Sequence, residues 1–325
     1  MTELVLGVDG GNTKTIALVA RVGGAVVGAG RGGCGDIYGH RGLDAAVAEI
    51  EQAVRAALPD GSRAEDVNAA VFSLAGADWD EDKAELLARV SRFVPRAQVR
   101  VVNDAIGALR TGLDDGIGVA VVCGTGGCVG SRGPDGREWH SSWWGLHTGA
   151  WAMGGDALQA VYAAELGIGS AAALTEAALE VYGEPTVEEI LHAFTRRDGR
   201  DPFDAALLTP SLLRLARSGD ATAAGIVRDH GAKLGSMAHV AVEKVGLEPP
   251  FRLLLLGGVM RGEGAGILVE EIVARVPGAE VVRPAREPAA GALLMAFDLA
   301  AAPCDPSVVD ATMPGAELFG THPAR

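Results

Sequence analysis

Two glycine-rich turns, each directly after an apolar run, constrain the fold more than any other feature of this sequence. The first reads Gly10-Gly11-Asn12-Thr13-Lys14 and the second reads Gly124-Thr125-Gly126-Gly127. Strand-like runs surround each turn, at 4–9, 15–21 and 25–30, and again at 117–123, 129–132 and near 138. The same order of strands therefore occurs twice, which predicts a structural duplication with two lobes.

Helical periodicity fills the intervals between these strands. In the first half we expect helices at 43–58, 80–94 and 104–111 and strands at 69–74 and 99–102. In the second half we expect a helical insertion at about 154–246, strands at 251–256 and 280–283, and helices at 265–276 and 288–300. This order predicts an α/β protein with lobes at 1–115 and 116–302. The residues after Ala302 lose the pattern, so 303–325 is predicted to be a loosely held tail.

The length and net charge of the chain argue against some classes of function. At 325 residues the chain exceeds a typical single domain, and its 28 basic and 42 acidic residues leave a net charge of −14. Such a surface would repel nucleic acid and anionic membranes, so we expect neither as a partner. No basic and apolar leader and no 18-residue apolar run occurs, which favours a cytoplasmic protein. An anionic ligand such as ATP must then be held by local N–H groups, a helix N-terminus or a metal ion.

The glycine-rich turns have the chemistry of phosphate sites. Glycines let main-chain N–H groups approach a phosphate closely, and Thr13 and Lys14 add a hydroxyl donor and a positive charge. Either turn alone could be an ordinary hairpin turn, but a glycine-rich turn occurs at the corresponding place in each half of the sequence. A third pair, Gly257-Gly258, follows the apolar run 253–256 and either offers bare backbone to an adenine and ribose or simply ends a strand.

Two aspartates stand at the ends of predicted strands. Asp9 directly precedes the first glycine-rich turn, and Asp104 follows the run 101–103 at the expected start of a helix. A kinase needs a base that accepts the proton of the acceptor hydroxyl as the γ-phosphoryl group leaves ATP, and Asp104 is our candidate for that base. The alternative is that Asp104 only caps the helix.

Taken together, the segments VDGGNTKT, SLAGADWDED, VVNDAIGAL, VVCGTGGCVGSRGPDGREW and LLLLGGVMRG resemble the BadF/BadG/BcrA/BcrD ATPase family over about residues 4–300. That family belongs to the superfamily of acetate and sugar kinases, heat-shock ATPases and actin. The resemblance implies two ribonuclease-H-like lobes that close over Mg-ATP, with helix 288–300 packing back toward the first lobe. It also implies that Asp9 holds Mg²⁺ through water, that residues 10–14 and 124–126 surround the phosphates, and that Gly257 and Gly258 contact adenosine.

The acceptor region departs from the family pattern. Asp36 stands where the sugar kinases of this family usually have Asn, and Trp143 and Ala150 replace a glycine and a sugar-binding Asp. Four of the five tryptophans lie within residues 139–151, either as a stacking wall for a ring or as core packing. Asp78 either contacts the acceptor or caps the helix near residue 80. The predicted acceptor residues are Asp36, Gly76, Asp78, Asn103, Trp143, Trp144, Gly145 and His147.

These observations favour a kinase that uses ATP and Mg²⁺ to phosphorylate a small polyhydroxylated acceptor: an amino sugar, an N-acetylhexosamine, another sugar or a cyclitol. We expect a homodimer. Two alternatives stay open. A non-catalytic nucleotide or sugar sensor would explain the altered acceptor segment. An activator ATPase of a 2-hydroxyacyl-CoA dehydratase would need cluster cysteines, whereas Cys123 and Cys128 only flank the second glycine-rich turn.

Overall fold

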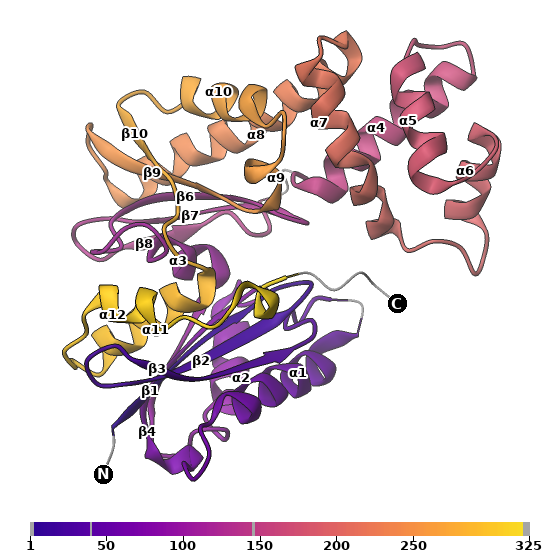
Figure 1. The fold of residues 1–325 in the computed structure, drawn as a ribbon. Coiled ribbons are helices and arrows are strands. Elements are labelled where there is room, and N and C mark those ends of the chain that lie inside the picture. The colour runs from indigo at the N-terminus through magenta and orange to yellow at the C-terminus, as the bar shows by residue number, and fades with distance from the viewer. Residues whose placement is uncertain (1–2, 40, 145–146, 321–325) are drawn as a thin grey trace. The chain divides into compact units, whose positions relative to one another are not determined.

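The computed structural model describes residues 3–39, 41–144 and 147–320. The chain divides into two compact units (Figure 1). Unit 1 comprises Met1–Ile117 and Pro284–Arg325, and unit 2 comprises Gly118–Arg283. Each unit is built around its own five-stranded sheet.

The sheet of unit 1 has the strand order β3-β2-β1-β4-β5. Its strands are β1 (Leu4–Gly10), β2 (Thr15–Arg21), β3 (Val26–Gly32), β4 (Val67–Leu74) and β5 (Gln98–Asn103). The first three strands pair antiparallel, and β4 and β5 continue the sheet in parallel with β1. The parallel part places the carboxyl ends of β1, β4 and β5 along one edge, where ligands bind in open α/β sheets.

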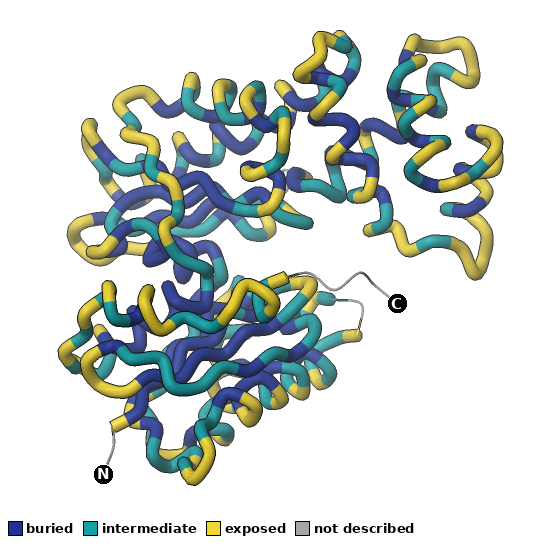
Figure 2. Tube along the Cα trace, viewed as in Figure 1, coloured by how far each residue is buried: buried dark blue, intermediate teal, exposed yellow. Residues whose placement is uncertain are grey.

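Helices cover both faces of this sheet, and its central strands are buried (Figure 2). On one face, α1 (Gly42–Ala57) packs directly on β3. A Cβ atom on Gly28, Gly30 or Gly32 would lie about 2 Å from a carbonyl oxygen of Ala57, Ala53 or Glu49. Alternate strand residues therefore meet every fourth helix residue, which brings the two backbones into contact.

The opposite face of β1 and β4 is covered by α11 (Pro288–Leu299), which comes from the far end of the chain. The remaining elements of unit 1 are η1 (Ala64–Asp66), α2 (Asp80–Val90), α3 (Asp104–Leu109), α12 (Pro306–Ala311) and η3 (Ala316–Leu318). α11 approaches closely because Gly7 leaves room for it: a Cβ there would lie 2.2 Å from the nitrogen of Leu293. The return of helix 288–300 to the first lobe, which the resemblance implied, is present.

Unit 2 repeats the same sheet with the strand order β10-β9-β6-β7-β8. Its strands are β6 (Gly118–Cys123), β7 (Gly127–Arg132), β8 (Glu138–His140), β9 (Phe251–Leu256) and β10 (Ala279–Val282). β6, β7 and β8 pair antiparallel, and β9 and β10 continue in parallel with β6. Two mixed sheets of one topology confirm the predicted α/β fold class and the duplication.

A helical insertion separates β8 from β9, as the sequence predicts. It consists of α4 (Ala150–Glu165), α5 (Ala172–Tyr182), α6 (Val187–Thr195), η2 (Pro202–Leu208), α7 (Thr209–Arg217) and α8 (Ala221–Val245). After β9 the unit is completed by α9 (Gly258–Arg261) and α10 (Gly266–Ala274). The long α8 packs on β7, β6 and α10, which joins the insertion to the core of unit 2.

The division into units differs from the sequence-based boundaries at the C-terminal end. The sequence predicted a second lobe at 116–302 and a tail at 303–325. In the structure, unit 2 ends at residue 283, and the chain from residue 284 onward belongs to unit 1. The described part of the tail is also not loose. Val309 of α12 is fully buried, and Cys304 forms a β-bridge with Gly23. These contacts lie almost 300 residues apart along the chain, so local periodicity gave no sign of them.

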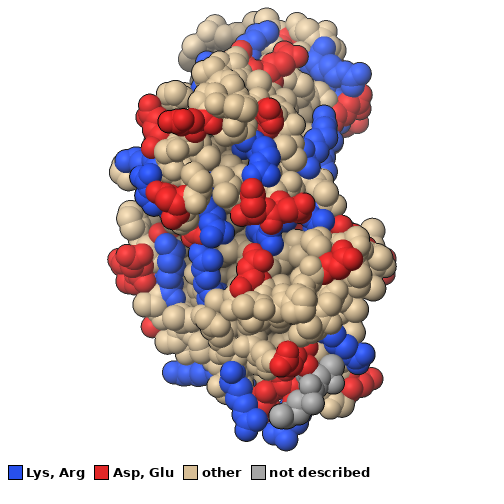
Figure 3. Space-filling view, turned by 90° about the vertical axis from the view of Figure 1, so that its left-hand side faces the viewer, with Lys and Arg blue, Asp and Glu red and all other residues tan. Residues whose placement is uncertain are grey.

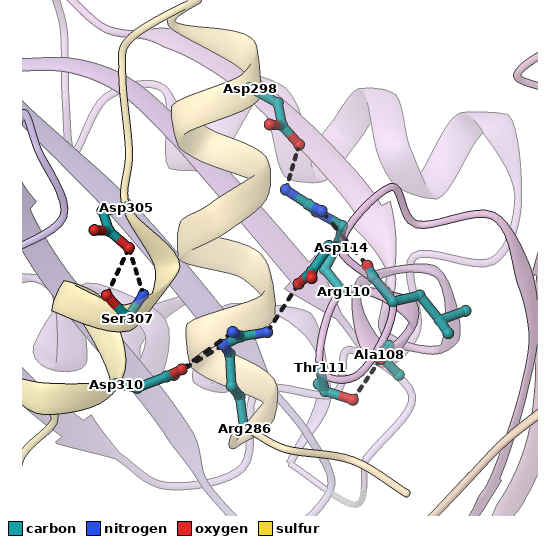
Figure 4. A network of polar contacts seen from close by, with 10 residues as sticks. Ala108, Arg110, Thr111, Asp114, Arg286, Asp298, Asp305, Ser307 and Asp310 are labelled. Atoms are coloured by element: carbon teal, nitrogen blue, oxygen red, sulfur yellow. Dashed lines mark hydrogen bonds and ion pairs between the residues drawn. The ribbon is translucent and has the colours of Figure 1, made fainter. Parts of the chain in front are cut away.

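Arg286 ties the C-terminal return to the rest of unit 1 (Figure 4). Its guanidinium donates to the carboxylates of Asp310 at 2.8 Å and Asp114 at 3.2 Å. Nearby, Arg110 forms an ion pair with Asp298 at 3.0 Å. The two points at which the chain leaves and re-enters unit 1 are therefore connected within that unit.

Among the described residues, no helix is both long and apolar enough to cross a membrane. On the face drawn in Figure 3, basic and acidic side chains are interspersed.

Candidate active site

The first glycine-rich turn joins β1 to β2 in unit 1. The N–H of Gly11 donates to the carbonyl of Lys14 at 2.9 Å, which closes the turn, while Asn12 and Thr13 are exposed. Gly10 itself is buried, and a Cβ on it would lie 2.7 Å from a methyl group of Leu74. The N–H of Ala75 donates to Gly10, and that of Gly35 donates to Gly11. The turn is therefore held by the loops that follow β4 and β3.

Asp9 and Asp104 lie at the ends of β1 and β5, on the parallel part of the sheet. Burial, together with the nearby charge of Asp104, raises the pKa of Asp9 to about 7, although Lys14 acts in the opposite direction. Burial, and then the charges of Asp78 and Asp36, raise the pKa of Asp104 to about 7 as well. A carboxyl group that titrates near neutral pH meets the requirement for a general base.

The structure brings the predicted acceptor residues of unit 1 together. Asp36 accepts a hydrogen bond from the N–H of Tyr38 at 2.9 Å. Gly76 touches Asp36, because a Cβ on it would lie 2.7 Å from the Asp36 carboxylate. Asp78 accepts from the side-chain amide of Asn103 at 2.8 Å. Burial and the charge of Asp78 raise the pKa of Asp36, so these groups form one acidic site.

Neither Asp104 nor Asp78 is the N-cap residue of the helix that follows it. Asn103 is the N-cap residue of α3 and accepts from the N–H of Ala105 at 3.0 Å, whereas Asp104 is the first residue inside the helix. Asp104 accepts from the same N–H at 2.9 Å. At α2 the N-cap residue is Trp79, not Asp78.

The second glycine-rich turn joins β6 to β7 in unit 2 and is bound by the start of α4. The N–H groups of Ala150 and Trp151 donate to the carbonyls of Gly124 and Thr125 at 2.9 and 3.0 Å. The preceding Gly149 has φ 95°, and a Cβ on it would lie 2.3 Å from the carbonyl carbon of Gly126. A side chain at this point would separate the helix from the turn.

The Gly257-Gly258 pair lies directly against the second turn. Gly257 has φ 104°, and a Cβ on it would lie 2.2 Å from the carbonyl oxygen of Cys123, the last residue of β6. Gly258 is exposed, and a Cβ on it would meet nothing within 4 Å. The two glycine segments predicted for phosphate and adenosine are thus neighbours within unit 2.

The tryptophan-rich segment divides into buried and exposed members. Trp139 and Trp151 pack on the core of unit 2, whereas Trp143 and Trp144 are 53% and 67% exposed. His147 makes an edge contact with Trp151, with ring centroids 5.9 Å apart. Core packing therefore accounts for only part of the cluster. The predicted acceptor residue Gly145 lies outside the described residues.

Sequence reasoning missed four residues around the first turn: Glu287, Arg31, Leu318 and Phe319. Glu287, at the start of α11, is among the charges that raise the pKa of Asp9. The Lys14 ammonium donates to the carbonyl of Phe319, and Arg31 donates to that of Leu318 at 2.7 Å. The Glu-Pro pair that opens α11 marks a helix start, but nothing in the sequence signals the two main-chain contacts.

Comparison with known proteins agrees with this arrangement. Residues 6–296 match the BadF/BadG/BcrA/BcrD ATPase family. The chain belongs to this family. A curated relative, the N-acetyl-D-glucosamine kinase of Dictyostelium discoideum, is 27% identical over 91% of this chain and 98% of its own length. The predicted family is confirmed, and the predicted enzyme class, an ATP-dependent phosphotransferase, agrees with this relative.

Solved structures show the same fold. A candidate N-acetylglucosamine kinase from Chromobacterium violaceum superposes with a TM-score of 0.66 at 22% identity, covering 90% of this chain and 98% of that chain. A ROK family glucokinase from Streptomyces griseus, in complex with glucose and AMPPNP, has a TM-score of 0.53 at 19% identity, covering 91% and 98%. Both support the two-sheet architecture described above.

Proposed function

We propose that this protein transfers the γ-phosphoryl group of Mg-ATP to a hydroxyl group of a small sugar-like acceptor. The observation that carries the proposal is the Asp104 carboxyl group, whose pKa is raised to about 7 beside Asp9 and the glycine-rich turn of unit 1. Family membership and the curated kinase relative support it.

In this proposal Asp104 accepts the proton of the acceptor hydroxyl. The acceptor oxygen forms a bond to the γ-phosphorus as the bond between that phosphorus and the bridging oxygen breaks, and ADP leaves with the electron pair. A base with a pKa near 7 is ionised in an appreciable fraction of molecules at neutral pH and still binds a proton well.

The glycine-rich segments 10–14 and 124–126, with the ammonium of Lys14, are the proposed phosphate contacts. Mg²⁺ suits the residues present, because Asp9 supplies a hard carboxylate oxygen. Burial and the charge of Asp104 raise the pKa of this carboxyl, and a bound cation would favour its ionised form. Bound Mg²⁺ would neutralise phosphate charge.

The proposed acceptor contacts are Asp36, Gly76, Asp78 and Asn103 of unit 1, and Trp143, Trp144 and His147 of unit 2. Carboxylates and an amide suit the hydroxyl or amino groups of a sugar, and exposed indole rings suit its apolar face. The acceptor class is an amino sugar, an N-acetylhexosamine, another sugar or a cyclitol. Ala150 supplies no carboxylate where the sugar kinases of the family have one, so N-acetylglucosamine is not singled out.

The test measures ADP release with a panel of amino sugars, N-acetylhexosamines, neutral sugars and cyclitols. At least one compound should stimulate turnover, and Asp104→Asn should lower that turnover by about 10²–10⁴-fold while ATP affinity stays nearly the same. Replacing the exposed Asp60 by Asn is the matched control. ATP binding without stimulation by any compound would favour a sensor, and full turnover in Asp104→Asn would refute the assigned base.

A further inference from the structure

The described C-terminal residues are fastened to the edge of the unit 1 sheet. α12 packs against the turn between β2 and β3, where a Cβ on Gly24 would lie 2.7 Å from the carbonyl oxygen of Asp305. Thr312, which directly follows α12, lies at the exposed edge of β3, where the N–H of Val26 donates to its hydroxyl at 2.9 Å. Arg286 also contacts α12, through the carboxylate of Asp310 (Figure 4).

Beyond α12 the chain continues toward the first glycine-rich turn. We call residues 313–320 the C-terminal strap. Arg31, near the end of β3, donates to the carbonyl of Leu318 at 2.7 Å. Val26 and Arg31 are five residues apart on β3, so the contacts span roughly 17 Å at the rise of a strand. Because β3 pairs antiparallel with β2, the end of β3 lies beside the start of β2. The strap therefore runs along β3 toward the first glycine-rich turn, which directly precedes β2.

At its end the strap reaches the lysine of that turn. The Lys14 ammonium donates to the main-chain carbonyl of Phe319. η3 presents this carbonyl and that of Leu318 on adjacent residues, and both face cationic side chains of unit 1. A neutral carbonyl is a weaker partner for an ammonium group than a phosphate oxygen, which carries charge. A polyphosphate is therefore the stronger partner for Lys14 and would displace the carbonyl.

We propose that the C-terminal strap is an autoinhibitory segment, which occupies Lys14 with the carbonyl of Phe319 and must leave before the phosphates of a nucleotide can use that lysine. This inference depends on the proposed nucleotide site. The apparent affinity for ATP is the affinity of the open state multiplied by the fraction of molecules that are open. A strap closed in about 70–90% of molecules therefore weakens ATP binding by about 3–10-fold.

The experiment compares ATP dissociation constants for two truncated chains. A chain that ends after Gly315 lacks both strap carbonyls but keeps α12 and its contacts with Gly24, Val26 and Arg286. A chain that ends after Gly320 keeps every described strap contact and is the matched control. We expect the shorter chain to bind ATP about 3–10-fold more tightly. We also expect ATP to increase hydrogen exchange at the amides of Leu318 and Phe319 in the full chain.

Arg31→Met supplies a second test within the intact sequence, in case the shorter chain folds poorly. This substitution removes the donor to Leu318 and leaves Lys14 in place, so it should tighten ATP binding in the same direction by a smaller factor. Equal ATP affinity in both truncated chains and in Arg31→Met refutes the strap alone. Weaker binding by the shorter chain shows that the strap positions Lys14 productively, which also overturns the proposal. Loss of ATP binding in every variant, including the full chain, refutes the nucleotide site itself.

Discussion

Removal of the Asp104 charge should stabilise the fold while abolishing most activity. The unfolded-state pKa of this carboxyl is near 3.8, whereas the folded-state pKa is raised to about 7 by burial and by Asp78 and Asp36. Below pH 4 both states bind the proton. As pH rises from 4 to 7 the unfolded chain releases it first, so the folded state loses stability, and above pH 7 the loss is complete and constant.

The size of the effect follows from that shift. A difference of about 3 pH units at 1.36 kcal/mol per unit gives an upper limit of about 4 kcal/mol. The amide that replaces the carboxyl in Asp104→Asn would keep the cost of burying a polar group, so we expect this variant to gain about 2 kcal/mol at pH 8.

Urea unfolding at pH 8 and at pH 4.5 measures this gain, with tryptophan fluorescence as the signal and Asp60→Asn as the exposed control. The gain should shrink toward pH 4.5, where most of the penalty on the wild-type protein has disappeared. If Asp104→Asn is less stable than the wild type at pH 8, or if its gain does not change with pH, then the carboxyl is not held in an unfavourable ionised state and the electrostatic reasoning fails.

Three further predictions concern activity and packing. Turnover of the wild type should rise with pH through about 7, as Asp104 loses its proton, and a flat rate between pH 6 and 8 would contradict the assigned base. Gly257→Ala, with φ 104° and a Cβ 2.2 Å from a carbonyl oxygen, should lower the melting temperature and cost about 2–4 kcal/mol of stability. The matched Gly258→Ala, in open space, should cost less than about 1 kcal/mol. Arg286→Ala should destabilise unit 1 by about 1–2 kcal/mol and speed hydrogen exchange in α12, whereas Arg217→Ala, at an exposed ion pair, should cost less than about 0.5 kcal/mol.

The sequence predicted the elements well because their signals are local. β9 was expected at 251–256 and runs over Phe251–Leu256, and β2 was expected at 15–21 and runs over Thr15–Arg21. Alternation, helical spacing and glycine turns depend on residues a few positions apart, so they can be recognised along the chain. The order of these signals, repeated twice, was also sufficient to predict two lobes of one topology.

The candidate site was predicted in part. Asp9, Asp104 and the glycine turns were found because each stands at the end of an apolar strand. The raised pKa of Asp104 could not be predicted from the sequence, because it depends on burial and then on the charges of Asp78 and Asp36, which two separate loops bring to the end of β5. The charges on those loops act through space, and their distance is set by how β4 and β3 lie in the sheet.

Residues 284–320 show which features the local sequence determines and which depend on the tertiary structure. The sequence alone determined that 288–300 is helical, but the choice of sheet face was made by packing: α11 lies on β1 and β4 because Gly7 lets the backbones meet. Likewise, the sequence marked 303–325 as irregular, and only the folded chain joins its carbonyls to Arg31 and Lys14. Local periodicity specifies which segments form helices and strands, whereas burial and hydrogen bonding between distant segments select their partners, and those interactions exist only once the whole unit has folded.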